Sequence, residues 1–363
     1  MAKRVWRFWG ISIAIAVALV WIHTALRQSI AARVDQRICF PAISHSGSHS
    51  FNPPSTNPTS ICYSQPIVLS KNQTAAIAVS PDGRMLVSGS RQMIQIWDLQ
   101  TQTLQSSWQG HNDWITAVAI SPKAQLLASA SLDGTIKLWD LQTGHLQYTI
   151  DAGRVTSLKF SPNGKLLASG SRLSRWADGK ISPKGVQLWQ VATGQLHDRL
   201  GNELVKAIAF SPNGQLLATG NQNTKIWKLA TGAQWRTINS GNVLSLTFSQ
   251  NSRKLISSSN RIKTWEVKTG RLMDEWEAVG SDIALSSNEN VLAVARGGTI
   301  NLLQLQPKRF LGSLRGSHYS GVSFDFSADT NAIISSSSDG IRIWQPQFVH
   351  LKNDAAKEQN HQF

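Results

Sequence analysis

The sequence is poor in the residues that metal sites and many catalytic sites require. Only two of its 363 residues are cysteines, and 21 acidic residues stand against 36 lysines and arginines. No cysteines have zinc-site spacing, and the HExxH, EF-hand, phosphate-loop and dinucleotide-binding motifs are also missing. These absences argue against a metalloenzyme or a nucleotide-dependent enzyme. We therefore expect no catalytic residue, no metal site and no cofactor.

Long hydrophobic runs are also scarce, and only one is long enough to suggest a membrane helix. Residues 8–26 contain no Asp, Glu, Lys or Arg. A helix of that length spans roughly 28 Å, close to the ~30 Å hydrocarbon core of a bilayer. We expect a basic tail and a single transmembrane helix over residues 1–27. A cleaved secretory signal is the alternative, with residues 29–31 as its cleavage site.

The side of the membrane on which the rest of the chain lies is not decided by charge. Three basic residues precede the apolar run and three follow it, so the positive-inside rule gives a tie. A short basic tail is usually retained while the segment after it is exported. We therefore favour a single-pass membrane protein whose larger part is exported.

A polar stem follows over residues 28–64, and we expect it to be flexible. Its second half is rich in proline, serine and asparagine, a composition typical of extended linkers. Both cysteines, Cys39 and Cys62, lie in it. In an exported stem they could form a disulfide, whereas in a cytosolic stem they would stay free thiols. The sequence leaves this choice open, and also leaves open that the two are unrelated.

The rest of the chain repeats one unit, seen most fully in residues 111–144. Alternating apolar and polar runs are separated by Ser-Pro and Asp-Gly turns, the pattern of four antiparallel strands. Two markers recur about every 38–50 residues, and each predicts seven units arranged radially. The first marker ends the third strand, at Trp97, Trp139, Trp189, Trp227, Trp265, Leu303 and Trp344. The second follows the first strand, at Ser80, Ser121, Ser161, Ser211, Ser249, Ser286 and Ser327.

A repeat of this length with a Trp-Asp pair resembles the WD-repeat, beta-transducin-like proteins, of bacterial type. The resemblance covers roughly residues 65–350 and implies an all-β, seven-bladed propeller, here preceded by the transmembrane helix and the stem. A polar tail follows at residues 351–363. In that family the first strand of the chain completes the last blade. Residues 65–70 are placed to do so.

The resemblance also implies a buried hydrogen-bonded set of His, Ser, Asp and Trp. Such a set resembles a hydrolase triad, but each serine lies within a strand and no oxyanion-forming segment follows it, so we interpret it as structural. The other five units lack the histidine, and we expect packing alone to hold them. The two complete sets are His111, Ser129, Asp133 and Trp139, and His318, Ser335, Asp339 and Trp344.

The third unit contains about ten extra residues in Arg172–Gly185, between its second and third strands. Long loops in compact folds are often functional, and exposed Trp and Arg side chains anchor interfaces. We therefore predict that this loop binds a protein partner. The alternative is an insertion without a function. Its candidate residues are Arg172, Arg175, Trp176, Lys180 and Lys184.

The net charge of +15 suits acidic protein partners or anionic lipid headgroups. No basic helix or stacking motif supports nucleic-acid binding. WD-repeat propellers mostly organise other proteins, so the resemblance implies a membrane-anchored scaffold for protein–protein interactions, assembling or regulating a membrane complex such as a transporter. The alternative is an exported propeller that binds a small ligand or acts as an enzyme at its central channel. Neutral residues are expected at the channel mouth, namely Thr74, Thr116, Thr156 and Ser245.

Overall fold

The computed structural model describes residues 38–41, 59–63, 66–171, 185–315, 323–327 and 332–350. It divides into a larger unit, Pro66–Pro346, and a smaller unit formed by Met1–Gln65 and Gln347–Phe363. The regular structure of the described residues is entirely β-strand. Within these ranges no helix is long and apolar enough to cross a membrane. The predicted membrane helix at residues 8–26 lies outside them.

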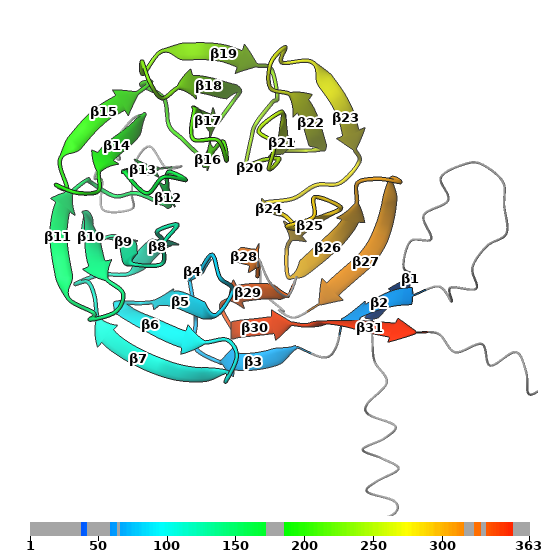
Figure 1. Ribbon diagram of the computed structural model, residues 1–363, viewed down its shortest axis with the longest axis horizontal. Helices are drawn as coiled ribbons and strands as arrows, with labels where there is room; N and C mark the ends of the chain where they lie inside the picture. Colours follow the sequence, from blue (N-terminus) through cyan, green and yellow to red (C-terminus); the bar gives the residue numbers. More distant parts are fainter. Residues whose placement is uncertain are drawn as a thin grey trace, which may run out of the picture. The chain divides into compact units, whose positions relative to one another are not determined.

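The larger unit is a seven-bladed propeller, and each blade is a four-stranded antiparallel sheet (Figure 1). The first three blades, from the inner strand outward, are β4 (Ala76–Val79), β5 (Met85–Ser90), β6 (Met93–Asp98) and β7 (Thr103–Gln109); β8 (Ile115–Ile120), β9 (Leu126–Ser131), β10 (Thr135–Asp140) and β11 (Leu146–Asp151); β12 (Ser157–Phe160), β13 (Leu166–Gly170), β14 (Val186–Gln190) and β15 (Leu196–Leu200). The fourth and fifth are β16 (Ala207–Phe210), β17 (Leu216–Gly220), β18 (Thr224–Lys228) and β19 (Gln234–Ile238); β20 (Ser245–Phe248), β21 (Lys254–Ser258), β22 (Ile262–Glu266) and β23 (Leu272–Trp276). The last two are β24 (Asp282–Leu285), β25 (Val291–Arg296), β26 (Thr299–Gln304) and β27 (Arg309–Arg315); β28 (Ser323–Phe326), β29 (Ile333–Ser337), β30 (Gly340–Trp344) and β3 (Ile67–Ser70).

The two rims of the propeller carry different connections. We call the rim with the blade-to-blade connections and the turns between second and third strands the top rim. The bottom rim carries the turns between first and second strands and between third and fourth strands. Serine organises the first kind of bottom turn, as Ser161 shows. Its hydroxyl donates to Asn163 Oδ1 at 2.8 Å and accepts from the Leu166 amide at 3.0 Å.

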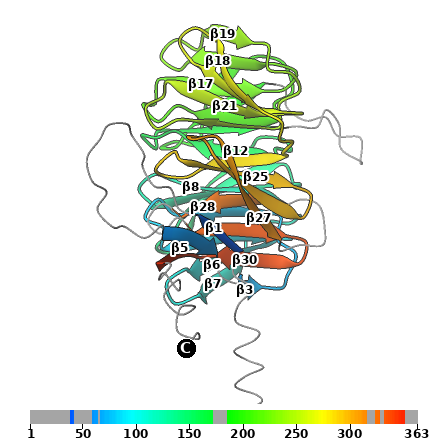
Figure 2. The same ribbon diagram turned by 90° about the vertical axis from the view of Figure 1, so that its right-hand side faces the viewer.

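The hydrophobic core lies between neighbouring blades. The cluster between the first two blades, for example, combines Ile94 and Ile96 with Ile115, Leu127 and Trp139. The inner strands contact one another in sequence, from β4 and β8 round to β28 and β4, so the ring is closed (Figure 1). Figure 2 shows the same blades from the side. Each blade therefore buries on its neighbours the apolar faces that one sheet cannot bury alone.

The strand that closes the ring comes from the start of the propeller, as predicted. β3 pairs antiparallel with β30, with Ile67 opposite Ile343 and Ser70 opposite Ile341. The seventh blade thus takes three strands from the end of the chain and one from its beginning. Because backbone hydrogen bonds join the two ends, β30 is not left as an edge strand, and β3 takes the outer position that the fourth strand holds in the other blades.

We expected packing alone to hold the five units that lack the histidine, and for four of them this is wrong, because a side-chain hydrogen bond joins their second and third strands. In six blades the third-strand Trp indole donates to a hydroxyl in the second strand. The sixth blade replaces both partners, placing Leu303 and Val294 in these positions. Replacing a buried hydrogen-bonded pair by two apolar groups costs little, whereas replacing one partner leaves the other unsatisfied. The hydroxyl partners are Ser88, Ser129, Ser169, Thr219, Ser257 and Ser335.

The smaller unit contains a three-stranded sheet in the order β1 (Ile38–Pro41), β2 (Thr59–Tyr63) and β31 (Pro346–His350). The predicted stem therefore includes two strands, and it is not a flexible linker throughout. Its Ile, Phe, Cys and Tyr residues are strand formers, but the surrounding Pro, Ser and Asn dominate the composition on which the prediction relied. The strand β31 pairs with the stem, although we expected it to lie within the propeller. The polar tail at residues 351–363 lies outside the structure described.

The closure of the ring predicts that alanine costs much more stability at one glycine than at the glycine in the same turn of another blade. A Cβ added at Gly340 (φ 121°) would overlap the carbonyl oxygen of Ser70 in the closing strand, whereas one added at Gly134 (φ 90°) meets nothing within 4 Å. We expect Gly134→Ala to cost about 1–2 kcal/mol through its backbone conformation alone. Gly340→Ala should cost clearly more, because it also displaces β3.

Chemical denaturation of the two variants measures this difference. Equal losses of unfolding free energy would mean that the contact between β3 and β30 does not limit the stability of the ring.

Candidate functional site

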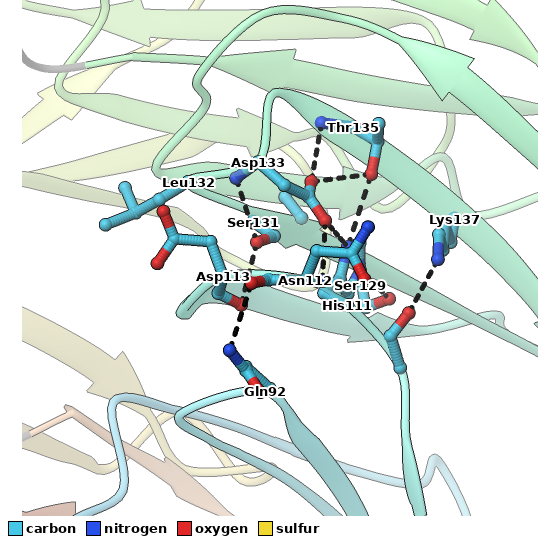
Figure 3. Close-up of polar contacts among 12 residues, drawn as sticks. Gln92, His111, Asn112, Asp113, Ser129, Ser131, Leu132, Asp133, Thr135 and Lys137 are labelled. Atoms are coloured by element: carbon cyan, nitrogen blue, oxygen red, sulfur yellow. Dashed lines mark hydrogen bonds and ion pairs between the residues drawn. The ribbon is translucent and has the colours of Figure 1, made fainter.

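A hydrogen-bonded network lies beneath the top rim of the second blade (Figure 3). His111 precedes β8, Ser129 lies in β9, Asp133 in the following turn and Trp139 in β10. The Nδ1 atom of His111 is 3.0 Å from Asp133 Oδ2, and its Nε2 atom is 2.8 Å from Ser129 Oγ. The indole of Trp139 donates to the same Ser129 oxygen at 2.8 Å. The structure thus brings the four residues of the first set together.

The protonation of this network follows from its geometry. Burial lowers the pKa of His111 below its ordinary value, although Asp133 opposes the shift, so the ring is neutral at pH 7. The ionised carboxylate of Asp133 can only accept, so the ring proton of His111 sits on Nδ1 and is donated to Asp133. The Nε2 atom of the neutral ring then accepts from the Ser129 hydroxyl.

Asp133 is the acceptor on which the network converges. Its Oδ1 atom accepts from the hydroxyl and amide of Thr135 at 2.7 and 3.0 Å, and its Oδ2 atom accepts from the amide of Asn112 at 3.1 Å. Burial alone would raise the pKa of Asp133, but these hydrogen bonds outweigh it and hold the pKa below its ordinary value. An ionised carboxylate therefore fixes the backbone that precedes β8.

The network is not arranged for nucleophilic catalysis. Ser129 has no exposed surface and receives the indole hydrogen of Trp139, so no substrate reaches its oxygen. His111 is almost wholly buried as well. A hydrolase needs its nucleophile open to substrate and next to donors for the oxyanion. The geometry supports the structural interpretation of this set.

The network holds a short loop that presents an exposed tryptophan, Trp114, on the top rim. Neighbouring groups bind the loop's carbonyl oxygens: Gln92 donates to Asn112 at 3.0 Å, and the Leu132 amide donates to Trp114 at 2.9 Å. Ser131 likewise donates to the carbonyl of Asp113 (Figure 3). Yet 43% of the Trp114 surface is exposed. The sequence interpretation missed this residue, whose only signal was a large aromatic next to the set.

Comparison with known proteins agrees with this geometry. The profile of the WD40 family (WD domain, G-beta repeat) matches residues 69–98, 102–140, 141–182 and 191–228. Four segments of the propeller therefore match the WD40 repeat. One relative is the small ribosomal subunit protein RACK1y of Oryza sativa subsp. japonica, 43% identical over 86 residues. The match covers 23% of this chain and 26% of that relative, so the chain spans about a quarter of the length of the relative it matches. That relative is a plant protein, and a bacterial type stays a prediction.

The second set, in the seventh blade, is described only in part. Trp344 donates to Ser335 Oγ at 3.1 Å, as in the other blades. Asp339 forms an ion pair with Arg342 at 2.8 Å, a contact that has no counterpart in the second blade. His318 lies outside the described residues.

The predicted partner-binding loop falls in residues 172–184, also outside the described ranges, and its residues stay sequence-based candidates. The positions on either side of it lie on the top rim. The Gly185 amide donates to the Glu203 carbonyl at 2.7 Å, and the Val205 amide donates to the Ser171 carbonyl at 3.0 Å.

Charged residues lie on the inner strands of the ring, next to the axis that the sequence interpretation expected to be neutral. Asp282 lies in β24, Asp325 in β28, and Lys159 in β12 on the opposite side of the ring (Figure 1). The charge of Lys159 acts on both carboxylates across the ring, from a blade that is three blades away from each. Ser245, one of the expected neutral residues, donates to Asp282 at 2.8 Å. The expectation of a neutral axis is therefore wrong.

Burial dominates the electrostatics of these two carboxyl groups. It raises the pKa of Asp282 and of Asp325, although Lys159 acts in the opposite direction. The charge of Asp325 raises the pKa of Asp282 further. Among the residues that the structure describes, no group of three or more His, Cys, Asp or Glu side chains could hold a metal ion.

The network predicts that Asp133 stabilises the fold. Asp133→Ala leaves His111 and the Asn112 amide without their acceptor, which should cost roughly 1–3 kcal/mol at neutral pH. Because the pKa of Asp133 is lowered in the folded state, this contribution should vanish as the pH falls through that pKa. Asp151→Ala, at the exposed end of β11, is the control and should change the unfolding free energy by less than about 0.5 kcal/mol.

The two variants are compared by urea unfolding. Asp133→Ala with wild-type stability would show that Asp133 does not support the loop.

At the axis we predict that an ionised carboxylate, that of Asp325, lowers stability, whereas that of Asp133 raises it. Because the pKa of Asp325 is raised in the folded state, its charge costs stability above that pKa, and the cost disappears below the unfolded value near 3.9. Asp325→Asn should therefore raise the melting temperature at pH 7, and the gain should shrink as the pH falls. Lys159 and Asp282 are the other charged groups at this position, and neither is changed.

Melting curves of both proteins over a pH series test this prediction. A variant that is less stable at pH 7 would mean that attraction to Lys159 outweighs burial.

Proposed function

We propose that this WD40 propeller is a membrane-tethered scaffold that binds a protein partner through the top rim of its second blade. Exposed Trp114 on a hydrogen-bonded loop is the observation that carries the proposal. Aromatic anchors with little freedom to lose are typical of binding hot spots. A scaffold needs no catalytic group. Ser129 of the network is fully buried, which fits a structural role for it.

The position of the chain ends in the propeller supports a tether. Pro66 precedes β3, whose first residue pairs with Ile343, next to Trp344 at the bottom end of β30. The propeller therefore begins and ends on the bottom rim. An anchor at residues 8–26 would precede this rim and leave the top rim free for a partner in a membrane complex, such as a transporter.

Bottom turns also carry groups suited to a membrane surface. Lys268, Arg271 and Arg309 are exposed there, next to exposed Leu272 and Phe310. Basic and apolar side chains together favour anionic lipid headgroups over bulk water. The relative in rice, a small ribosomal subunit protein by name, supports a role within a larger assembly, though not its identity here.

A second candidate function is binding of a small charged ligand at the axis on the exported side. Asp282, Asp325 and Lys159 favour it, because they place opposite charges across the ring. It ranks second because, in the described part of the chain, no third His, Cys, Asp or Glu joins these two carboxyl groups. The same residues also admit a purely structural role.

The scaffold proposal predicts a local effect of Trp114. Trp114→Ala should weaken partner capture from detergent-solubilised membranes by about 2 kcal/mol or more, roughly thirtyfold, without loss of stability. Leu146→Ala is the matched control, because Leu146 lies on the opposite rim of the same blade with a similar exposure of 46%. Trp176→Ala tests the predicted loop in the same assay.

Partner identity comes from mass spectrometry of the wild-type capture. Equal yields from Trp114→Ala and Leu146→Ala would move the binding surface away from this loop. Recovery of the full chain in the soluble fraction would contradict the membrane anchor but not the binding surface at Trp114.

A further inference from the structure

The two cysteines of the chain occupy facing positions in the small sheet. β1 and β2 run antiparallel, with Ile38 opposite Tyr63, Cys39 opposite Cys62 and Pro41 opposite Ser60. Facing residues of an antiparallel pair lie on the same face of the sheet. The chain has no other cysteine with which either could pair.

Pro41 determines which kind of facing pair the cysteines form. Facing pairs alternate between those that exchange two backbone hydrogen bonds and those that exchange none. Pro41 has no amide hydrogen, so its pair with Ser60 belongs to the second kind. The pair of Cys39 and Cys62 lies two positions along the strands from the pair of Pro41 and Ser60. It is therefore also a pair that exchanges no backbone hydrogen bonds.

This phase brings the two backbones close together. Facing Cα atoms in pairs without hydrogen bonds are about 4.5 Å apart, against about 5.5 Å in the others. Disulfides need Cα atoms roughly 4.4–6.8 Å apart. The register therefore satisfies the distance condition without any backbone movement.

We propose that Cys39 and Cys62 form an intramolecular disulfide that fastens β1 to β2. The two thiols lose two protons and two electrons, and a disulfide-bonded carrier is reduced to two thiols in exchange. The bond closes a loop of about 24 residues, which should favour the closed sheet by about two orders of magnitude. It also secures the strand on which β31 pairs. The proposal does not depend on the membrane anchor or on Trp114.

The test equilibrates the full, detergent-solubilised chain in equal concentrations of reduced and oxidised glutathione, followed by acid quenching and mass spectrometry. We expect a species two hydrogen atoms lighter than the dithiol, and a peptide that links residues 39 and 62. A chain that carries two glutathione adducts, or two free thiols, overturns the proposal. So does a disulfide-linked dimer.

A register control makes the result specific. Cys39→Ser combined with Phe40→Cys moves the first thiol by one residue, to a position that faces Ile61 on the other side of the sheet. This variant should form mainly glutathione adducts under the same conditions. An equal yield of intramolecular disulfide from the variant would show that chain proximity, and not the register, brings the cysteines together. That result also overturns the proposal.

Discussion

The pairing of β3 with β30 is the contact on which the propeller depends. No blade can bury both faces of its sheet alone, so each is stable only between two neighbours. The first and last blades must therefore contact each other. Packing alone could bring them together, but the shared sheet adds backbone hydrogen bonds between the two ends of the propeller. Gly340 shows how closely they fit, because no side chain is tolerated where β30 begins beside Ser70.

The sequence was sufficient for features that recur and insufficient for features that occur once. Seven units, the closing strand and the set around Asp133 follow from repeated turns and tryptophans. The Trp–Ser hydrogen bond could also have been found, because Leu303 and Val294 change together in the blade that lacks it. The pairing of β31 with β2 could not, since it joins strands almost 300 residues apart and no repeat marks it. Nor did the pattern show that Lys159 acts on Asp282 and Asp325 across the ring, because the three residues lie in three separate blades and no repeat marks them.

Buried polar groups and exposed apolar groups have separate tasks in the second blade. His111, Ser129 and Asp133 satisfy one another, so their cost of burial is offset and the loop before β8 is fixed in place. Trp114 is left exposed by the same arrangement, since its backbone is bound and its side chain is not buried. A fixed loop loses little conformational entropy on binding, which is the physical reason to regard this rim as an interface.

Site-specific photo-crosslinking in intact cells tests the central claim most directly. A photoreactive amino acid is placed at position 114 in one variant and at position 146 in another, so that the top and bottom rims of one blade are compared. The account predicts a covalent adduct with a discrete protein from position 114 and none from position 146. Adducts of equal yield at both positions, or only at position 146, would contradict it.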